Sequence, residues 1–139
     1  MDQANIDRIA NSFGAQSMME TLGAQLSEVS EGLVRITAPI LEGTRQQQGF
    51  GHAGLTFSIG DSAAGYAALT MLPMDQEVVT AEIKINLLAP ARGDLLIATG
   101  RVIKPGKRLV VVTSEVHAEL DGKQTLVAIL QGTMVPVAN

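Results

Sequence analysis

The sequence predicts an α+β domain in which one long apolar helix packs against antiparallel strands. The run from His52 to Leu72 is weakly polar, shows no strand alternation and ends before Pro73, as is typical of a buried helix. After it the apolar residues recur with a period of two, and tight turns at Pro105-Gly106 and Asp121-Gly122 separate the later strands. Four consecutive strands with short connections favour an antiparallel meander with the helix on one face.

Length and composition exclude several classes of function. A chain of 139 residues suffices for one domain, residues 1–139, but not for separate cofactor and substrate domains. The net charge is −4 and no basic block exceeds Lys107-Arg108, so we expect no nucleic-acid partner. The absence of cysteine excludes disulfides and thiolate chemistry. Neither a signal peptide nor a membrane span is recognisable, so we expect a cytoplasmic protein without a membrane partner.

The segments before the long helix predict short elements. Residues 5–22 place apolar side chains three to four positions apart, which predicts one or two short amphipathic helices. Residues 24–40 predict two short strands about the Glu31-Gly32 turn, with Pro39 ending the second. Residues 41–51 are polar and rich in glycine, which predicts a loop.

The first strand after the helix has the clearest alternation in the chain. Val79, Ala81, Ile83, Ile85 and Leu87 alternate with polar residues, so we expect these five side chains to face the core. Three further strands follow, over residues 94–104, 108–120 and 124–137.

A glycine motif precedes the long helix. Gly49, Gly51 and Gly54 are spaced as G-x-G-x-x-G, which in a βαβ unit binds a dinucleotide pyrophosphate. Here the motif follows a polar loop, and no parallel strand comes after it. The dinucleotide interpretation therefore fails, and we expect no cofactor. What remains is a helix start whose free N–H groups and dipole favour negative charge.

Asp61 lies inside the apolar run, where an ionised carboxylate is costly unless it is paired or hydrogen-bonded. Two interpretations stand side by side. The carboxylate bonds Ser58 or Ser62, or reaches solvent; alternatively, it is a general base or nucleophile whose pKa is raised by desolvation.

The catalytic interpretation has a geometric consequence. In a helix that begins near His52, the Ala53 amide and the Asp61 carboxylate are separated by eight residues, about 12 Å along the axis. One carbonyl group cannot contact both. They converge only if a second copy of the helix runs antiparallel alongside, and small residues permit that approach: Gly54, Gly60, Ala63, Ala64 and Gly65. The catalytic interpretation therefore predicts a homodimer with two shared sites.

Several stretches of the sequence resemble one known family. They are "FGAQSMMETLGAQL", "GFGHAGLTFSIGDSAAGYAA", "VVTAEIKINLLAPARGD" and "RVIKPGKRLVVVTSEVHAELDGKQTLVAILQGTM", which cover nearly all of the chain beyond residue 12. They resemble the hotdog-fold acyl-CoA thioesterases, in the PaaI-like and hydroxybenzoyl-CoA thioesterase branch. The resemblance implies a long central helix wrapped by an antiparallel sheet, hydrolysis of acyl-CoA to free acid and CoA, and a homodimer that pairs further into a dimer of dimers.

The resemblance also implies roles for individual residues. Asp61 falls on the family's catalytic carboxylate, a base toward water or a nucleophile. Ala53 falls on the residue whose backbone N–H polarises the thioester carbonyl, Gly54 follows in the first turn, and His52 falls on a histidine that orders this turn. The family commonly has His-Gly-Gly where this chain has "HAG", and Ala53 can still donate its N–H provided that its φ is negative.

Two more positions match the family's site. Gln46 lies where relatives carry an Asn or Gln that orients water or the carbonyl, with Gln47 and Gln48 as neighbouring registers. Thr80 falls on a Ser or Thr that assists the attacking water.

Substrate contacts are expected at two further places. Candidates for the CoA phosphates are the basic residues near the Pro105-Gly106 turn, with Arg92 and Lys84 as alternatives: Lys104, Lys107 and Arg108. Candidates for the lining of an apolar acyl groove come from the long helix: Leu55, Phe57 and Tyr66.

Other chemistries have little support in the sequence. No G-x-S-x-G nucleophile motif is present, and His52 and His117 lack a carboxylate set that predicts a metal site. The catalytic histidine motifs of hotdog dehydratases are not recognisable. The main alternative is a non-catalytic acyl-CoA or acyl-ligand binding protein of the same fold, because fold does not fix function.

Overall fold

The computed structural model describes the whole chain, residues 1–139, and contains one six-stranded antiparallel sheet in the order β1-β2-β4-β5-β6-β3. The helices are α1 (Gln3–Ala15), α2 (Ser17–Thr21), the 3-10 turn η1 (Glu42–Thr44) and α3 (Ala53–Leu69). The strands are β1 (Gln25–Ser30), β2 (Leu33–Pro39), β3 (Gln76–Leu87), β4 (Leu95–Lys104), β5 (Val110–Leu120) and β6 (Lys123–Ala138).

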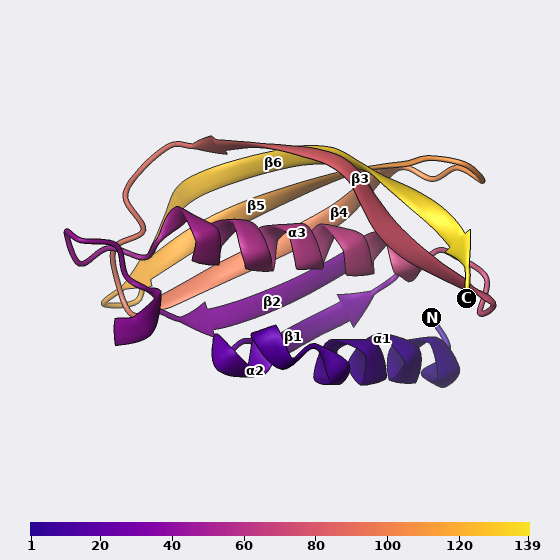
Figure 1. Cartoon of the computed structure of the whole chain (residues 1–139), viewed down its shortest axis with the longest axis horizontal. Coiled ribbons are helices and arrows are strands. Elements are labelled where there is room, and N and C mark those ends of the chain that lie inside the picture. The colour runs from indigo at the N-terminus through magenta and orange to yellow at the C-terminus, as the bar shows by residue number, and fades with distance from the viewer.

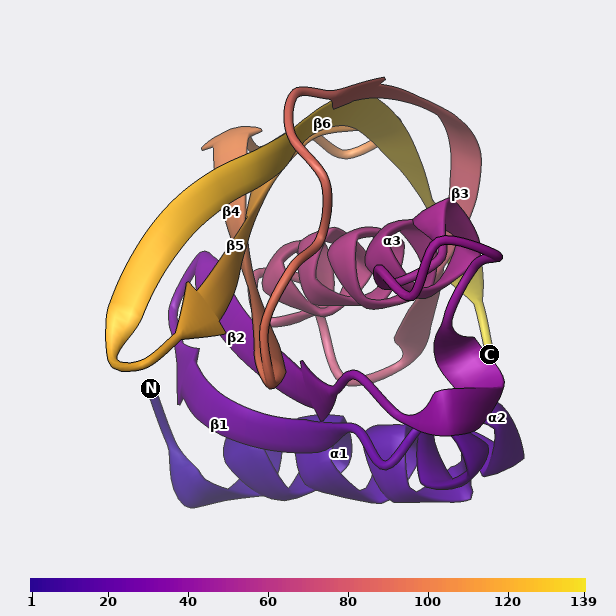
Figure 2. The ribbon, with the colours of Figure 1, turned by 90° about the vertical axis from the view of Figure 1, so that its left-hand side faces the viewer.

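The sheet curls around α3, so this helix is the centre of the molecule (Figures 1 and 2). The predicted long helix is confirmed, although it ends at Leu69, before the expected Leu72. Its end is fixed by Thr70, whose hydroxyl donates to the Ala67 carbonyl at 2.7 Å and accepts from the Gly32 amide at 2.8 Å. The β1–β2 turn therefore holds the last turn of α3.

Close packing fixes α3 against the middle of the sheet. Gly100 on β4 faces the backbone of α3, and a Cβ atom there would collide with the carbonyl of Ala63 and the amide of Ala64. Gly60, one turn earlier on the same side of the helix, lets the Leu130 side chain of β6 approach α3. The rest of the core is aliphatic, because the chain has only three Phe, one Tyr and no Trp.

The predicted four-stranded meander is wrong for β3. Strands β4, β5 and β6 follow one another across the sheet, but β3 pairs with β6, and β4 takes β2 as its other neighbour. The cause is the connection over residues 88–94, which is too long for a tight hairpin. Its Leu88 amide donates to Val127 and its Ala91 pairs with Gly51, so the chain crosses the end of the sheet before β4 begins.

The predicted alternation of β3 is also wrong, in its first half and at its last residue. A β-bulge between Thr80 and Glu82 shifts the register, so Val78 and Thr80 face α3 before it. After the bulge Ile83 and Ile85 pack on the core as expected. Val79, Ala81 and Leu87 were predicted to face inward but are exposed, Val79 by 50% and Leu87 by 57%. The extra residue therefore determines which side chains of β3 reach the helix.

The N-terminal helices lie beside β1 (Figure 2), and Arg8 of α1 reaches the last turn of α3. The Arg8 guanidinium donates to the carbonyls of Leu69, Leu72 and Pro73 at 2.6, 3.0 and 2.8 Å. These carbonyls lie at and just beyond the helix end, where a positive charge is favourable. Arg8 thus fastens α1 to α3.

We expect Arg8→Met to lower the free energy of unfolding by about 1–3 kcal/mol, because it removes charge-assisted bonds to three carbonyls and keeps the apolar stem. Urea unfolding measures this change. Arg101→Met, on the exposed part of β4, is the control and should have little effect. Equal stability of Arg8→Met and wild type would contradict the conclusion that Arg8 stabilises the packing of α1 on the end of α3.

Candidate active site

The start of α3 is ordered by His52, the N-cap residue. Its Nδ1 atom accepts from the Gly54 amide at 2.8 Å, and its own amide donates to the Thr44 carbonyl at 2.9 Å. Gly54 makes this cap possible, because a Cβ atom there would lie 3.0 Å from His52 Nδ1. The structure therefore shows His52 and Gly54 bonded to each other.

The Ala53 amide is the free donor at this helix start. Gly54 donates to His52 Nδ1 and Leu55 to the His52 carbonyl, whereas no group of the chain accepts from Ala53. Asp121 is the only non-glycine residue with positive φ, so Ala53 has the negative φ that its donor role requires. An exposed N–H at the positive end of a helix dipole is suited to a developing oxyanion.

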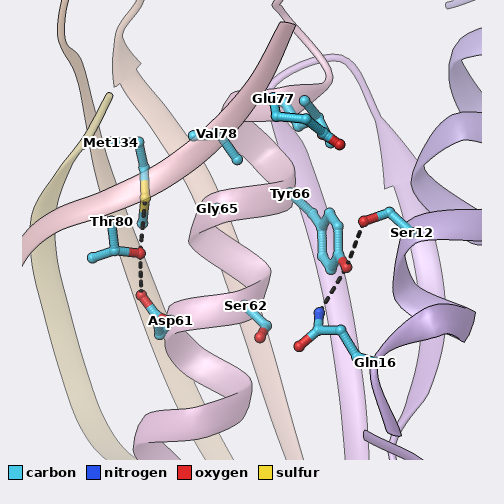
Figure 3. A pocket seen from close by; sticks show the side chains of 11 residues that line it. Ser12, Gln16, Asp61, Ser62, Gly65, Tyr66, Glu77, Val78, Thr80 and Met134 are labelled. Carbon is cyan, nitrogen blue, oxygen red and sulfur yellow. Dashed lines mark hydrogen bonds between the residues drawn. The ribbon is translucent and has the colours of Figure 1, made fainter. Parts of the chain in front are cut away.

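Asp61 lies in the middle of α3 and is half-buried. The Thr80 hydroxyl donates to Asp61 Oδ1 at 2.8 Å, across from β3 (Figure 3). Neither Ser58 nor Ser62 holds the carboxylate, since Ser58 donates to the Gly54 carbonyl and Ser62 makes no bond to Asp61. The bulge in β3 explains this contact, because it turns Thr80 toward the helix.

Burial raises the pKa of Asp61 above its ordinary value of 3.8, and the hydrogen bond from Thr80 lowers it to a smaller extent. Desolvation penalises the ionised form of a carboxylate, so a desolvated carboxylate takes up a proton more readily.

Ala53 and Asp61 do not meet within one chain. Both belong to the regular helix α3, so eight residues separate them by about 12 Å along its axis. The face of α3 between them is open and consists of partly or fully exposed residues: Gly54, Phe57, Ser58 and Asp61.

A cavity of about 400 Å³ opens beside Asp61, between α3, β3 and α1 (Figure 3). At one end lie Asp61 and Thr80. At the other the Tyr66 hydroxyl bonds Gln16 Nε2 at 2.6 Å and the Ser12 hydroxyl at 3.1 Å. Tyr66 was expected at a substrate groove, but Ser12 and Gln16 were not. The sequence around Ser12 and Gln16 does not predict their contact with Tyr66, because each of them lies fifty or more positions from Tyr66 in the chain.

A second cavity of about 490 Å³ lies at the start of α3 and includes Gln46, Phe50, His52 and Ala53. Gln46 shapes the loop, since its Oε1 accepts from the amides of Gln48 and Phe50. The Arg92 guanidinium lies 5.3 Å from the centre of the Phe50 ring, at the same end of the sheet.

The expected groove residues separate into two groups. Leu55 is 3% exposed and belongs to the hydrophobic core, so its side chain lies away from the open face of the helix. Phe57 is 37% exposed on the open face of α3. Only Tyr66 of the three lines the cavity beside Asp61.

The basic residues at the β4–β5 connection lie far from the Ala53 amide of the same chain. The start of β4 is next to the loop before α3, through the Gly51–Ala91 pair. Lys104 ends the ten-residue strand β4, about 30 Å away, and Lys107 and Arg108 follow it. Figure 1 shows this connection at the opposite end of the molecule from the loop before α3.

A model described as the thioesterase superfamily matches residues 48–124, more than half of the chain. The chain belongs to the thioesterase superfamily. The matched residues contain the whole of α3, Asp61 and Thr80. A thioesterase family protein from Silicibacter pomeroyi has the same fold, with a TM-score of 0.95 and 34% identity over 97% of this chain and 99% of its own. The predicted α+β hotdog architecture is thereby confirmed.

Two further proteins are similar to the chain. The 1,4-dihydroxy-2-naphthoyl-CoA hydrolase of Listeria monocytogenes is 29% identical over 90 residues, 65% of this chain and 73% of the relative. The E. coli PaaI protein of the phenylacetic acid degradation operon shares the fold, with a TM-score of 0.87, 23% identity and coverage of 97% and 94%. No helix of this thioesterase-superfamily chain has the length and apolar character needed to cross a membrane.

Proposed function

We propose that the chain hydrolyses acyl-CoA thioesters to a free acid and CoA, at two sites shared between the subunits of a homodimer. The observation that carries the proposal is the half-buried Asp61, bonded to Thr80 beside a cavity on an open helix face. The free Ala53 amide supplies the complementary group. Membership of the thioesterase superfamily and similarity to an acyl-CoA hydrolase support the substrate class.

The chemistry follows from these two groups. The thioester carbonyl oxygen accepts from the Ala53 amide of one subunit, where the dipole of α3 stabilises the negative charge that develops. Asp61 of the other subunit removes a proton from water, and the hydroxide adds to the carbonyl carbon. The carbon–sulfur bond then breaks, the acid is released and the CoA sulfur takes the proton. Direct attack by the Asp61 carboxylate is the alternative route to the same products.

The free edge of the sheet supports the dimer. Strand β3 is an edge of the sheet, twelve residues long, and its outward side carries exposed apolar residues such as Val79. An edge of this kind can pair with the same edge of a second copy about a two-fold axis. The two α3 helices then run antiparallel, which brings Ala53 of one subunit toward Asp61 of the other. Pairing of dimers into a tetramer is part of the same proposal.

The dimer also gives the distant basic residues a role. With the helices antiparallel, the β4–β5 connection of one subunit approaches the start of α3 in the other. We therefore assign Lys104, Lys107 and Arg108 to the CoA phosphates of the partner's site. All three side chains are exposed and free of ion pairs within the chain.

Release of free thiol from a panel of aromatic and medium-chain acyl-CoAs tests the activity. Hydrolysis of at least one of them is the expected result. Binding of acyl-CoA without thiol release from any member of the panel would instead support the non-catalytic binding protein.

Thr80 gives a prediction about pH. Its hydrogen bond lowers the pKa of Asp61, so Thr80→Val raises that pKa further. A general base acts only when ionised, and kcat/KM therefore falls as the pH drops through this pKa. We expect the acidic limb of the profile to move to higher pH, with a loss of about tenfold at low pH, as for one lost bond to a charged group. Thr80→Ser keeps the hydroxyl and should keep the profile; an unmoved limb in Thr80→Val would exclude this role.

A further inference from the structure

We propose that the cavity beside Asp61 receives the acyl group, and that the Tyr66, Ser12 and Gln16 cluster at its far end selects acyl groups with a neutral hydrogen-bonding group, such as a hydroxyl, at their distal end. This inference rests on the proposed thioester hydrolysis and adds the kind of acyl group. It follows from the dimensions, the hydrogen bonds and the charge of the cavity.

One cavity is lined by both the reacting carboxylate and the polar cluster. Asp61 and Tyr66 both project from α3, and five residues separate them by about 7.5 Å along the axis. Gly65 lies between them and adds no side chain to the cavity; a Cβ atom there would make an ordinary contact with Met134, at 3.9 Å (Figure 3). The cavity is also lined by three apolar side chains, Leu69, Val78 and Met134, and by the Ser62 hydroxyl, which lies between the two ends (Figure 3).

The polar cluster keeps a proton to donate. Tyr66 and Ser12 each carry one hydroxyl proton, and the bond between the two oxygens uses only one of them. The Gln16 amide donates to the Tyr66 oxygen. One hydroxyl proton therefore remains for a ligand that ends at the cluster, whichever way the Ser12–Tyr66 bond points. An acyl group with a hydrocarbon end would leave that donor without a partner.

The cluster is held in place from two sides. The Phe13 ring contacts the Tyr66 ring with centroids 6.2 Å apart, and the Tyr66 side chain is 6% exposed. Asn5 donates to the Thr70 carbonyl at 2.7 Å, and Arg8 fastens α1 to the end of α3. Because the same helix carries Ser12 and the fastening residues, the far wall is fixed relative to Asp61.

The charge of the cavity decides between neutral and anionic ends. Two carboxylates line it, Asp61 and Glu77, and no lysine or arginine does. A carboxylate at the distal end of an acyl group would be repelled and would find no cation. A hydroxyl carries no charge and can both donate and accept. The cavity therefore favours hydroxy-acyl over both alkyl-acyl and carboxy-acyl groups.

The test compares hexanoyl-CoA, 6-hydroxyhexanoyl-CoA and adipoyl-CoA, three six-carbon thioesters that differ at the distal end. We expect kcat/KM to be about 3- to 10-fold higher for 6-hydroxyhexanoyl-CoA than for hexanoyl-CoA, as for one neutral hydrogen bond, and lowest for adipoyl-CoA. Tyr66→Phe and Ser12→Ala should each bring the hydroxyhexanoyl-to-hexanoyl ratio close to one. Ser27→Ala removes a hydroxyl on the exposed strand β1 and should leave the ratio unchanged.

The outcomes separate the two proposals. If neither the three thioesters nor the panel of aromatic and medium-chain acyl-CoAs releases thiol, the proposed hydrolysis fails. If the panel is hydrolysed and the three thioesters are not, hydrolysis stands and the selection is overturned. If the wild type hydrolyses them with a hydroxyhexanoyl-to-hexanoyl ratio at or below one, hydrolysis stands and the selection is overturned. A ratio above one that persists in both Tyr66→Phe and Ser12→Ala also overturns it, and thermal melting verifies that these variants are folded.

Discussion

Replacement of Asp61 by Asn is expected to lower kcat for thioester hydrolysis by about 10²- to 10⁴-fold, the contribution of a positioned general base. Asn keeps an oxygen that accepts from Thr80 Oγ1 but cannot take a proton from water. Thiol release under saturating substrate measures the loss. Asp75→Asn removes an exposed carboxylate between α3 and β3 and should retain full activity. A rate for Asp61→Asn within about threefold of wild type would exclude Asp61 as the base or the nucleophile.

The same substitution should leave the fold intact and should not lower the melting temperature. The pKa of Asp61 is raised on folding, so the folded state binds this proton more tightly than the unfolded state. The contribution of Asp61 to stability is therefore largest at low pH and declines as the pH rises through its pKa. Above that pKa, Asp61→Asn should melt at the same or a higher temperature than wild type; in acid the difference should vanish.

Ala53→Pro is expected to lower kcat by about 10²- to 10³-fold, because proline has no N–H to donate to the oxyanion. Ala53 is the first residue of α3, a position where proline is tolerated, and His52 before it has an extended ψ of 145° that suits a following proline. The helix should therefore form normally. Ala53→Gly keeps the N–H and serves as the matched control, with activity close to wild type.

Mixing the two inactive variants tests the shared site. A heterodimer of Asp61→Asn and Ala53→Pro has one site with both groups intact and one site with neither. After random exchange of subunits at equal concentrations, half of the dimers are mixed, so activity should return to about a quarter of the wild-type value. No recovery, with exchange verified by mass spectrometry, would place both groups of each site in one chain or remove them from the mechanism.

The sequence predicts the central elements because their patterns are local. The apolar run that ends at Pro73 and the period-two strands both depend on neighbouring residues, and the helix and the strands are where they were expected. Pairing in the sheet is not local. The position of β3 beside β6 depends on the path of residues 88–94 across the end of the sheet, which no periodicity records.

The candidate site also has a part that the sequence predicts and a part that it does not. Asp61 is recognisable in the sequence because an ionised carboxylate inside an apolar helix is costly, and the family resemblance identifies Ala53 and Thr80 as further site residues. The contact between Thr80 and Asp61 depends on a bulge that reverses the expected alternation of β3. Ser12 comes from α1 and Gln16 is the residue that follows this helix, in a segment whose periodicity predicts amphipathic helices. Their meeting with Tyr66 follows from the packing of α1 and has no counterpart in the local pattern.

The contact between Gly100 and the backbone of α3 has a consequence for the symmetry of the proposed dimer. It limits how far the helix can slide along its own axis against β4. In a two-fold pair of antiparallel helices, each slide is matched by an equal and opposite slide of the partner. The distance from an Ala53 amide to the facing carboxylate therefore changes by twice the displacement of one helix. A larger side chain at residue 100, remote from both reacting groups, would alter both sites at once and by a doubled amount.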